Sequence, residues 1–536
     1  MHQLMGSSNL FSVLLFLVLL IGWIMIHRWG QRNSKGPKTW PIFGAAIEQL
    51  NNYHRMHDWI LGYLSESKTI TVPMPFTCYI YTADAANVEH ILKNNFANYP
   101  KGELYKSCMD VLLGDGIFNA DGELWRKQRK TASFEFASRN LRDLSTVVFR
   151  EYSLKLSAIL CQLSCIDHQT VDIQDLFMRM TLDSICMVGF GVEIGTLSST
   201  LPDNSFARAF DTANMIVTLR FIDPLWRLKR FFSLGSEAIL KQSIKTIDDF
   251  TYHVIRRRKE QITMVSQDSN FKDDQMHHDI LSRFIKLGCE DHDRDFSTEK
   301  SLRDVVLNFV IAGRDTTATT LSWFIYMIIT QPRVAEKLHT ELKVFEETRS
   351  EEEDINLVSY ALDDMQSFRS RLSQFAGLLD YDSLGRLHYL HASITETLRL
   401  YPAVPQDPKG VLEDDVLPDG TRVKSGGMVT YVPYSMGRTE YNWGHDASVF
   451  RPERWLKDDL IFQNSASPFK FTAFQAGPRM CLGKDSAYLQ LKMTLSILCR
   501  FFHFTLAPDH PPVQYKMMTI LSMIHGLNVL VSPREP

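Results

Sequence analysis

"FQAGPRMCLG", residues 474–483, places a single cysteine, Cys481, between two glycines and close to an arginine. A cysteine that binds a metal does so as a thiolate, which nearby backbone N–H groups and positive charges stabilise. Gly477 and Gly483 allow tight turns that would point amide groups at the sulfur, and Arg479 is a fixed cation that suits a carboxylate. A cysteine buried in the core needs none of these features. The stretch therefore predicts that Cys481 is a metal ligand.

The composition of the chain excludes several classes of protein. With 536 residues, of which 45% are hydrophobic, the chain can bury a large core, and its length alone favours two or three domains. The net charge of −4 gives no reason to expect a nucleic acid partner. The 8 cysteines are scattered along the chain, which is not a disulfide framework and favours a reducing compartment.

The N-terminal region differs from the rest. Residues 10–26, LFSVLLFLVLLIGWIMI, carry no charge, and basic residues follow them from His27 onward. This length is at the lower limit for a bilayer span, and the basic residues place the remaining chain in the cytosol. We expect an uncleaved transmembrane signal anchor at 1–28, a proline-rich hinge at 29–44 and the main domain at 45–536. A cleaved signal peptide is the alternative.

The main part of the chain is helical in pattern. The clearest helix is predicted to begin at Ser301, where SLRD matches a capping box, and to stop before Pro332. Strand-like alternation is confined to 77–82 and 411–433, where LPDGT predicts a turn. The polar stretches 266–278 and 346–354 are predicted to be surface loops. The expected fold is mainly α, with a small β-rich portion.

The predicted long helix contains AGRDTT, residues 312–317, which does not favour a helix interior. Gly313 alone costs about 1 kcal/mol relative to alanine. One interpretation is that Gly313 packs closely against a neighbouring helix while threonine hydroxyls bond back to the preceding turn. However, an acid, Asp315, and a hydroxyl, Thr316, follow the glycine. We therefore expect a local opening of the helix that holds a small molecule and a proton path.

Three further motifs are weak when each is taken alone. ETLR places Glu396 and Arg399 on one helix face, where they can pair, and FRPERW contributes Arg454. WRKQR places Trp125 and Arg129 one helical turn apart. The order of these motifs along the chain carries more information than any one of them.

Taken in order, the motifs resemble those of the cytochrome P450 superfamily. The haem-binding loop of that family, F-x-x-G-x-R-x-C-x-G, is filled at every fixed position by Phe474, Gly477, Arg479, Cys481 and Gly483. The other signatures are W-x-x-x-R at Trp125 and Arg129, A-G-x-D-T at 312–316, E-x-x-R at Glu396 and Arg399, and P-E-R at 452–454. The resemblance extends over the chain from the predicted anchor onward.

This resemblance implies a single cytochrome P450 fold in place of several domains, with haem b between the long helix and the cysteine loop. Cys481 is implied as the axial thiolate ligand of the haem iron. The other implied haem contacts are Trp125, Arg129 and Arg479 at the propionates, Phe474, Gly477 and Gly483 in the loop, and Ala312 and Gly313 on the helix. Glu396, Arg399 and Arg454 are implied as a structural triad, and Asp315 and Thr316 as the catalytic pair that delivers protons.

Within the superfamily the chain resembles the plant fatty-acid ω-hydroxylases, in stretches such as LRLYPAVPQDPKGVLEDDVLPDGT and GGMVTYVPYSMGR. GELWRKQRKTASFEFASRNLRDLS and VGFGVEIGTL resemble the anther-expressed branch, whose products form pollen-wall sporopollenin and cutin. The implied activity is NADPH- and O2-dependent hydroxylation of the terminal carbon of long-chain fatty acids. Some animal ω-hydroxylases link haem covalently through a glutamate. Since this chain has Ala312 there, we expect no such bond.

Other activities remain as alternatives. An in-chain fatty-acid hydroxylase would share every motif. An O2-independent fatty hydroperoxide isomerase or dehydratase, or a haem sensor without enzymatic activity, would have no use for Asp315 and Thr316. Terminal C–H bonds are stronger than their neighbours, so ω-hydroxylation requires a channel that positions the chain end. By resemblance its walls include Ile117, Phe118, Val310, Ala403, Val404 and Leu521, unless these belong to the core.

The resemblance also implies partners and a location. Electrons would come from NADPH through the flavins of NADPH–cytochrome P450 reductase, which could dock on Arg126, Lys127 and Lys130. An ordinary solvated helix face is the alternative for these residues. The implied location is the endoplasmic reticulum membrane, in contact with lipid, with a single span and a cytosolic catalytic domain.

Overall fold

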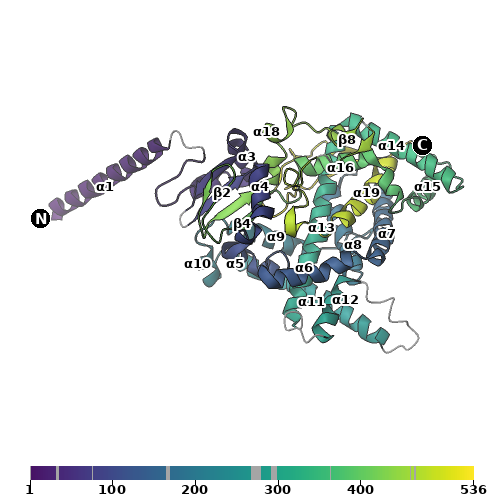
Figure 1. The fold of residues 1–536 in the computed structure, drawn as a ribbon, viewed down its shortest axis with the longest axis horizontal. Coiled ribbons are helices and arrows are strands. Elements are labelled where there is room, and N and C mark those ends of the chain that lie inside the picture. Colours follow the sequence, from purple (N-terminus) through teal and green to yellow (C-terminus); the bar gives the residue numbers. More distant parts are fainter. Residues whose placement is uncertain are drawn as a thin grey trace.

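The body of the molecule is built around one long helix, α13 (Glu299–Thr330), which crosses it (Figure 1). Its N-cap is Thr298, whose hydroxyl accepts a hydrogen bond from the Ser301 N–H at 3.1 Å. The predicted start at Ser301 is therefore wrong by two residues, since the capping residue lies before the helix rather than at Ser301. The helix ends before Pro332, as predicted.

We describe a computed structural model, which covers residues 2–31, 36–74, 77–164, 169–266, 279–290, 298–362, 364–458, 460–463 and 466–535. The helices before α13 are α1 (His2–Gly30), α2 (Ala46–Asn51), α3 (Met56–Glu66), α4 (Ala85–Glu89), α5 (Gly102–Leu113), α6 (Gly122–Phe136), α7 (Arg139–Ser164), α8 (Ile173–Phe190), α9 (Ser205–Leu219), α10 (Trp226–Phe231), α11 (Ser236–Ser266) and α12 (Ile280–Glu290). Those after it are α14 (Pro332–Glu352), α15 (Met365–Gly377), α16 (His388–Leu400), α17 (Pro433–Met436), α18 (Glu440–Trp443) and α19 (Lys484–Phe501).

Small sheets complete the fold. The largest has the order β1 (Thr69–Pro73), β2 (Cys78–Thr82), β7 (Met428–Tyr431) and β4 (Asp407–Gly410), with β2 and β7 parallel. A second sheet joins β10 (Phe502–Leu506), β11 (Asn528–Pro533) and β3 (Val171–Asp172). Two short hairpins pair β5 (Asp415–Val416) with β6 (Arg422–Val423), and β8 (Leu456–Lys457) with β9 (Ile461–Phe462). The mainly α prediction, the strand within 77–82 and the turn at LPDGT are confirmed.

Helices and sheet occupy different ends of the body. The sheet with β2 and β4 lies toward the end from which α1 projects, whereas α7, α8, α14 and α19 gather at the other (Figure 1). Helix α13 packs mainly against α8 and also contacts α16 and α19. Buried apolar residues of α8, α13, α16 and α19 and of strands β2 and β7 belong to one hydrophobic core.

The prediction of a surface loop at 346–354 is wrong, because helix α14 continues to Glu352. Glu346 is fully buried, and its two carboxylate oxygens accept hydrogen bonds at 2.8 Å from Arg371 on α15 and from Arg500 on α19. The run of acidic residues does not repel itself because Glu346 points inward to two cations. The other predicted polar loop, 266–278, lies outside the described residues except for Ser266, which ends α11.

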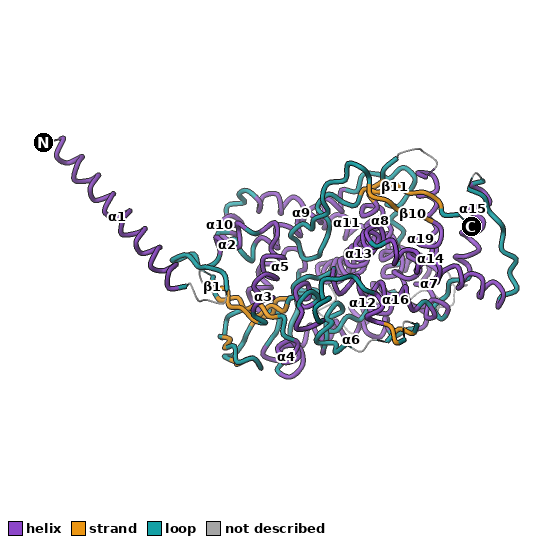
Figure 2. Tube along the Cα trace, turned by 90° about the horizontal axis from the view of Figure 1, so that it is seen from above, coloured by secondary structure: helices purple, strands orange, loops and turns teal. Residues whose placement is uncertain are grey.

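Helix α1 projects from one end of the body (Figures 1 and 2). Its described apolar side chains are largely exposed; Phe16, for example, is 64% exposed. Within the part of the chain that the structure describes, no helix has the length and apolarity required to cross a bilayer. The predicted transmembrane anchor is therefore not confirmed.

A buried ion pair on α16 holds the segment that leads to the cysteine loop. Arg399 donates to both carboxylate oxygens of Glu396, at 2.7 and 2.8 Å, and to the carbonyls of Ala447 and Val449 at 2.6 and 3.0 Å. Arg454 approaches Glu396 at 3.5 Å. The structure thus brings the three predicted triad residues together and ties α16 to the chain around 447–454.

We predict that Glu396→Gln lowers the free energy of unfolding by about 3–5 kcal/mol, because it leaves the buried Arg399 without a compensating charge. Chemical unfolding followed by circular dichroism would measure the loss. Arg386→Ala is the control, since it breaks only the exposed ion pair with Glu352 and should change stability little. Equal effects of the two substitutions would contradict the role given to Glu396.

Candidate functional site

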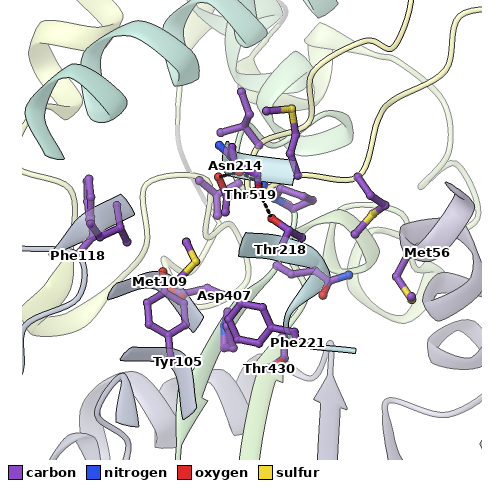
Figure 3. Close-up of a pocket in the computed structure, with 18 of the residues that line it drawn as sticks. Met56, Tyr105, Met109, Phe118, Asn214, Thr218, Phe221, Asp407, Thr430 and Thr519 are labelled. Atoms are coloured by element: carbon purple, nitrogen blue, oxygen red, sulfur yellow. Dashed lines mark hydrogen bonds between the residues drawn. The ribbon is translucent and has the colours of Figure 1, made fainter. Parts of the chain in front are cut away.

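Two adjoining cavities lie beside the middle of α13. The inner cavity, about 260 Å³, is bounded by the cysteine loop on one side and α13 on the other, and the outer cavity, about 230 Å³, extends from it toward α3. Figure 3 shows the outer cavity, with Phe118 at one end and Met56 at the other. The residues that line both cavities are Lys101, Phe118, Ala312, Thr316, Val404, Asp407 and Gln475. We call this shared region the passage.

The cysteine loop presents its sulfur to the inner cavity. The Cys481 N–H donates to the Phe474 carbonyl at 2.9 Å, which closes the loop, and the Gly483 N–H donates to the Cys481 sulfur. Gly477 has a φ of 67°, and a Cβ at this position would overlap the carbonyl of Leu92. Cys481 is exposed, but to the cavity that it lines. The loop precedes α19, whose N-terminus favours a negative charge.

The surroundings of Cys481 correct one prediction. Burial raises the pKa of the Cys481 thiol above its ordinary value, although the Gly483 N–H, Arg129 and Lys484 act to lower it. The predicted stabilisation of the thiolate is present but is weaker than the cost of burying the charge. A bound metal cation overcomes this cost, because a coordinating thiol is deprotonated outright.

Positively charged side chains gather at one side of the inner cavity. Arg479 donates to Asp121 at 2.6 Å and to the Ala120 carbonyl at 3.0 Å, and its guanidinium lies 4.4 Å from the ring centroid of Trp125. Arg129 donates to the Met480 carbonyl at 2.7 Å. The Arg479 Nε is buried and has no hydrogen-bond partner among the described residues. A carboxylate at this side of the cavity would satisfy it.

A second charged cluster was not predicted. Lys101 and Lys409 donate to Asp407 at 2.8 and 2.9 Å, and the Tyr431 hydroxyl donates to it at 2.7 Å. Burial lowers the pKa of Lys409 to about 7. For Asp407, burial alone would raise the pKa, but the two lysines hold it well below its usual range. Two lysines face one carboxylate. The spacing of Asp407 and Lys409, which places both on one face of β4, was the available signal.

The predicted opening of the long helix is absent, since α13 is helical throughout AGRDTT. Gly313 lies against α8, and a Cβ there would overlap the side chain of Ile185. The Thr316 hydroxyl donates to the Ala312 carbonyl at 2.6 Å. Close packing at Gly313 and hydrogen bonding from a threonine to the preceding turn therefore explain this segment. This was the alternative to the helix opening that we had expected. Ala312, Gly313 and Thr316 nevertheless line the inner cavity.

Unlike Thr316, Asp315 is not among the described residues that line either cavity. It is fully buried and accepts a hydrogen bond from Arg314 at 2.6 Å. Arg314 is 3.7 Å from Asp211 on α9, which also accepts from Lys516 at 2.9 Å. Burial raises the pKa of Asp315 to about 6, against the opposing effect of Arg314. Its carboxyl can therefore change protonation near neutral pH.

The predicted channel residues fall into two groups. Phe118 and Val404 line both cavities, and Ile117 and Ala403 line the inner one. Val310 and Leu521 are not among the described cavity residues; both are buried, and the Leu521 carbonyl accepts from the Trp323 indole at 2.6 Å. The neighbours of Leu521 that do line the outer cavity are Met517, Met518, Thr519 and Ile520.

A cysteine loop that faces a long helix across a cavity, with cations at one side, is the arrangement of a haem-thiolate protein. The family model of cytochrome P450 matches residues 34–531, and the chain belongs to the cytochrome P450 family. The predicted family is thus confirmed.

Relatives agree with this assignment. The chain is 67% identical over 521 residues to cytochrome P450 704B1 of Arabidopsis thaliana, and the matched region covers 96% of this chain and 98% of that protein. It is 47% identical over 500 residues to cytochrome P450 704C1 of Pinus taeda, with 92% of each chain covered. Cytochrome P450 86B1 of Arabidopsis thaliana is 36% identical over 525 residues, with 97% and 89% covered.

The chain is accordingly a monooxygenase that uses haem iron and takes electrons from NADPH through a reductase. The residues of the inner cavity fit a haem group. Cys481 offers a sulfur ligand to the cavity, and the Arg479 Nε, which has no partner in the described part of the chain, suits a propionate. Trp125 and Arg129 lie on the same side.

We predict that Cys481→Ser abolishes thiolate ligation. The reduced, CO-bound protein should lose the red-shifted Soret band typical of a thiolate ligand, and hydroxylation should stop. Cys78→Ser is the matched control, because Cys78 lies on β2 and lines neither cavity. A thiolate spectrum that survives in Cys481→Ser would assign the ligand elsewhere.

Proposed function

We propose that the protein hydroxylates the terminal carbon of long-chain fatty acids, using one oxygen atom of O2. The observation that carries this proposal is the shape of the outer cavity, which extends from Met56 to Phe118 (Figure 3). Most of its wall is apolar, including Met109, Leu112, Leu113, Phe221, Ile222, Met517, Met518 and Ile520. An alkyl chain suits such a cavity. The end of the alkyl chain remote from the carboxylate would enter the passage first.

Positioning, rather than reactivity, must select the terminal carbon, because terminal C–H bonds are stronger than internal ones. Phe118 and Val404 meet Ala312 and Thr316 at the passage. In our proposal these four side chains admit only the end of the alkyl chain to the inner cavity. Following the resemblance to the anther-expressed branch, we propose that the products are precursors of sporopollenin and cutin.

Haem bound through Cys481 supplies the activation of O2. The chain supplies the protons. The Thr316 hydroxyl is held at the passage by its hydrogen bond to the Ala312 carbonyl. The buried Asp315 carboxyl, whose pKa burial raises to about 6, holds a proton below that pH and can take up and release one near it. Arg314 and Asp211 continue the charged chain from Asp315 toward α9, where the Asp211 side chain is 34% exposed. We propose that protons enter at Asp211 and leave through Thr316.

We also propose that the flavin-containing reductase docks beside α6. This helix carries the cavity residues Trp125 and Arg129 together with Arg126, Lys127 and Lys130. An acidic surface on the reductase would complement these cations.

Attachment to the endoplasmic reticulum membrane is part of the proposal, with 1–28 as anchor, 29–44 as hinge and 45–536 as the cytosolic catalytic domain. Helices α1 and α10 lie toward the same end of the molecule (Figures 1 and 2). Around α10 the exposed apolar residues are Leu225, Leu228, Phe231, Phe232 and Leu234, and Phe231 is 81% exposed. A lipid surface would cover them.

We predict that the protein, combined with reductase and NADPH, oxidises long-chain saturated fatty acids mainly at the terminal carbon, because only the chain end passes Phe118 and Val404. Mass spectrometry of the products would locate the new oxygen. Products hydroxylated only within the chain would refute the ω assignment, and turnover of fatty hydroperoxides without NADPH would point to an isomerase.

We predict that Thr316→Ala diverts electrons to peroxide, so that NADPH is consumed while hydroxylated product falls. Asp315→Asn should slow product formation by about 100-fold, as expected for the loss of a proton donor. Thr319→Ala is the control on the same helix, since Thr319 is buried and lines neither cavity. Unchanged peroxide yield in Thr316→Ala would remove this residue from the proton path.

The pH dependence should follow the Asp315 carboxyl. Because its pKa is about 6, the protonated fraction falls as the pH rises through this value. The wild-type share of electrons lost to peroxide should therefore increase from pH 5.5 to 7.5, with Arg314, Asp211 and Lys516 as the charged groups around Asp315. Asp315→Asn should show no such increase.

A further inference from the structure

The N-terminal half of α13 forms hydrogen bonds with the C-terminal end of α5 and with the loop that follows α5. The last carbonyls of a helix have no partner within that helix. Arg303 donates to the Val111 and Leu112 carbonyls, both at 3.1 Å. Asn308 donates to the Leu113 carbonyl at 2.9 Å. Helix α13 thus provides the C-terminal cap of α5.

The same residues of α13 also bind the loop that continues to Phe118. Asp304 accepts from the Asp115 N–H at 3.0 Å, and the Asn308 side-chain oxygen accepts from the Phe118 N–H at 3.1 Å. All three of Arg303, Asp304 and Asn308 are buried, and Asn308 is 0% exposed. Their polar atoms would be costly to bury without these partners. The contacts therefore hold the loop in one position.

Two glycines bring the loop this close to α13. A Cβ at Gly114 would overlap the carboxylate of Asp304, and a Cβ at Gly116 would overlap the side-chain amide of Asn308. Gly114 also has a φ of 54°, which favours glycine. The loop and the helix are therefore matched to each other at both positions.

Resting on the proposed function, we propose that Arg303, Asp304 and Asn308 form a clamp that fixes Phe118 in the passage and so determines which carbon of the substrate is hydroxylated. They are positioning residues, since none of the three lines either cavity. Phe118, which lines both, lies at the end of the outer cavity in Figure 3. If the clamp is released, the phenyl ring no longer blocks internal carbons.

The test compares product distributions from a saturated fatty acid. Asn308→Leu removes the bonds to Leu113 and Phe118 at nearly constant volume. The ratio of terminal to internal products should fall about tenfold, the size expected when one buried hydrogen bond no longer fixes the position. The thiolate spectrum should be unchanged. Asn442→Leu is the matched control, because Asn442 also holds backbone carbonyls, at 3.1 and 3.2 Å, but lines neither cavity.

Gly116→Ala tests the clamp from the opposite side and leaves α13 unchanged. Its Cβ should push the loop away from Asn308 and broaden the product distribution to a similar extent. Because both substitutions act through one contact, the double variant should resemble either single variant. If both single variants keep the wild-type distribution, or if Asn442→Leu broadens it as much as they do, the clamp is refuted.

A second measurement separates the clamp from the proposed function. Hydrogen exchange of the haem-loaded protein should become at least tenfold faster for the Phe118 amide in Asn308→Leu and stay unchanged in Asn442→Leu. An unchanged Phe118 rate would refute the clamp whatever the substrate. If the wild type hydroxylates internal carbons, the proposed ω position is wrong, and the clamp still predicts a broader distribution of positions in both variants.

Discussion

The unbroken hydrogen-bond ladder of α13 is the constraint on which the site depends. A helix rises about 1.5 Å per residue, so Asn308 and Thr316 are held about 12 Å apart along one rigid axis. Near its N-terminus the helix binds the α5–α6 loop, in its middle it lines both cavities, and farther on Trp323 holds the carbonyl of Leu521. Helix α13 thus positions two other segments that line the outer cavity, the α5–α6 loop and the residues next to Leu521, relative to its own cavity-lining residues.

Buried charge is the second feature that organises the molecule. Glu396 with Arg399, Asp407 with Lys101, and Glu346 with Arg500 each join segments that are distant in the sequence. The net contribution of each pair to the free energy of unfolding is small, because the cost of removing two charges from water offsets most of their attraction. Each fixes an orientation, however, because an unpaired partner would be costly. Of these residues, Lys101 and Asp407 line both cavities.

The parts of the site that could be predicted are those with a local signature. Cys481 was identifiable because a ligand loop needs its glycines and its cation within a few residues, and the order of the other motifs supplied the family. The Lys101–Asp407 pair joins residues 306 positions apart, and the Asn308–Phe118 bond joins residues 190 positions apart. Periodicity indicates which face of an element is buried but not what it will meet. For the same reason the run of acids at 346–354 was misread as a loop, since the partners Arg371 and Arg500 lie 25 and 154 positions from Glu346.

The dependence of α5 on α13 for its C-terminal cap bears on how specificity can be transferred between relatives. The loop from Gly114 to Phe118 is not an independent module, because its two glycines pack so closely against Asp304 and Asn308 that no Cβ fits between them. A chimera that exchanges only this loop would bring the new side chains without the helix surface that orients them. Loop and helix face must be exchanged as one unit, although nearly 200 residues separate them in the chain.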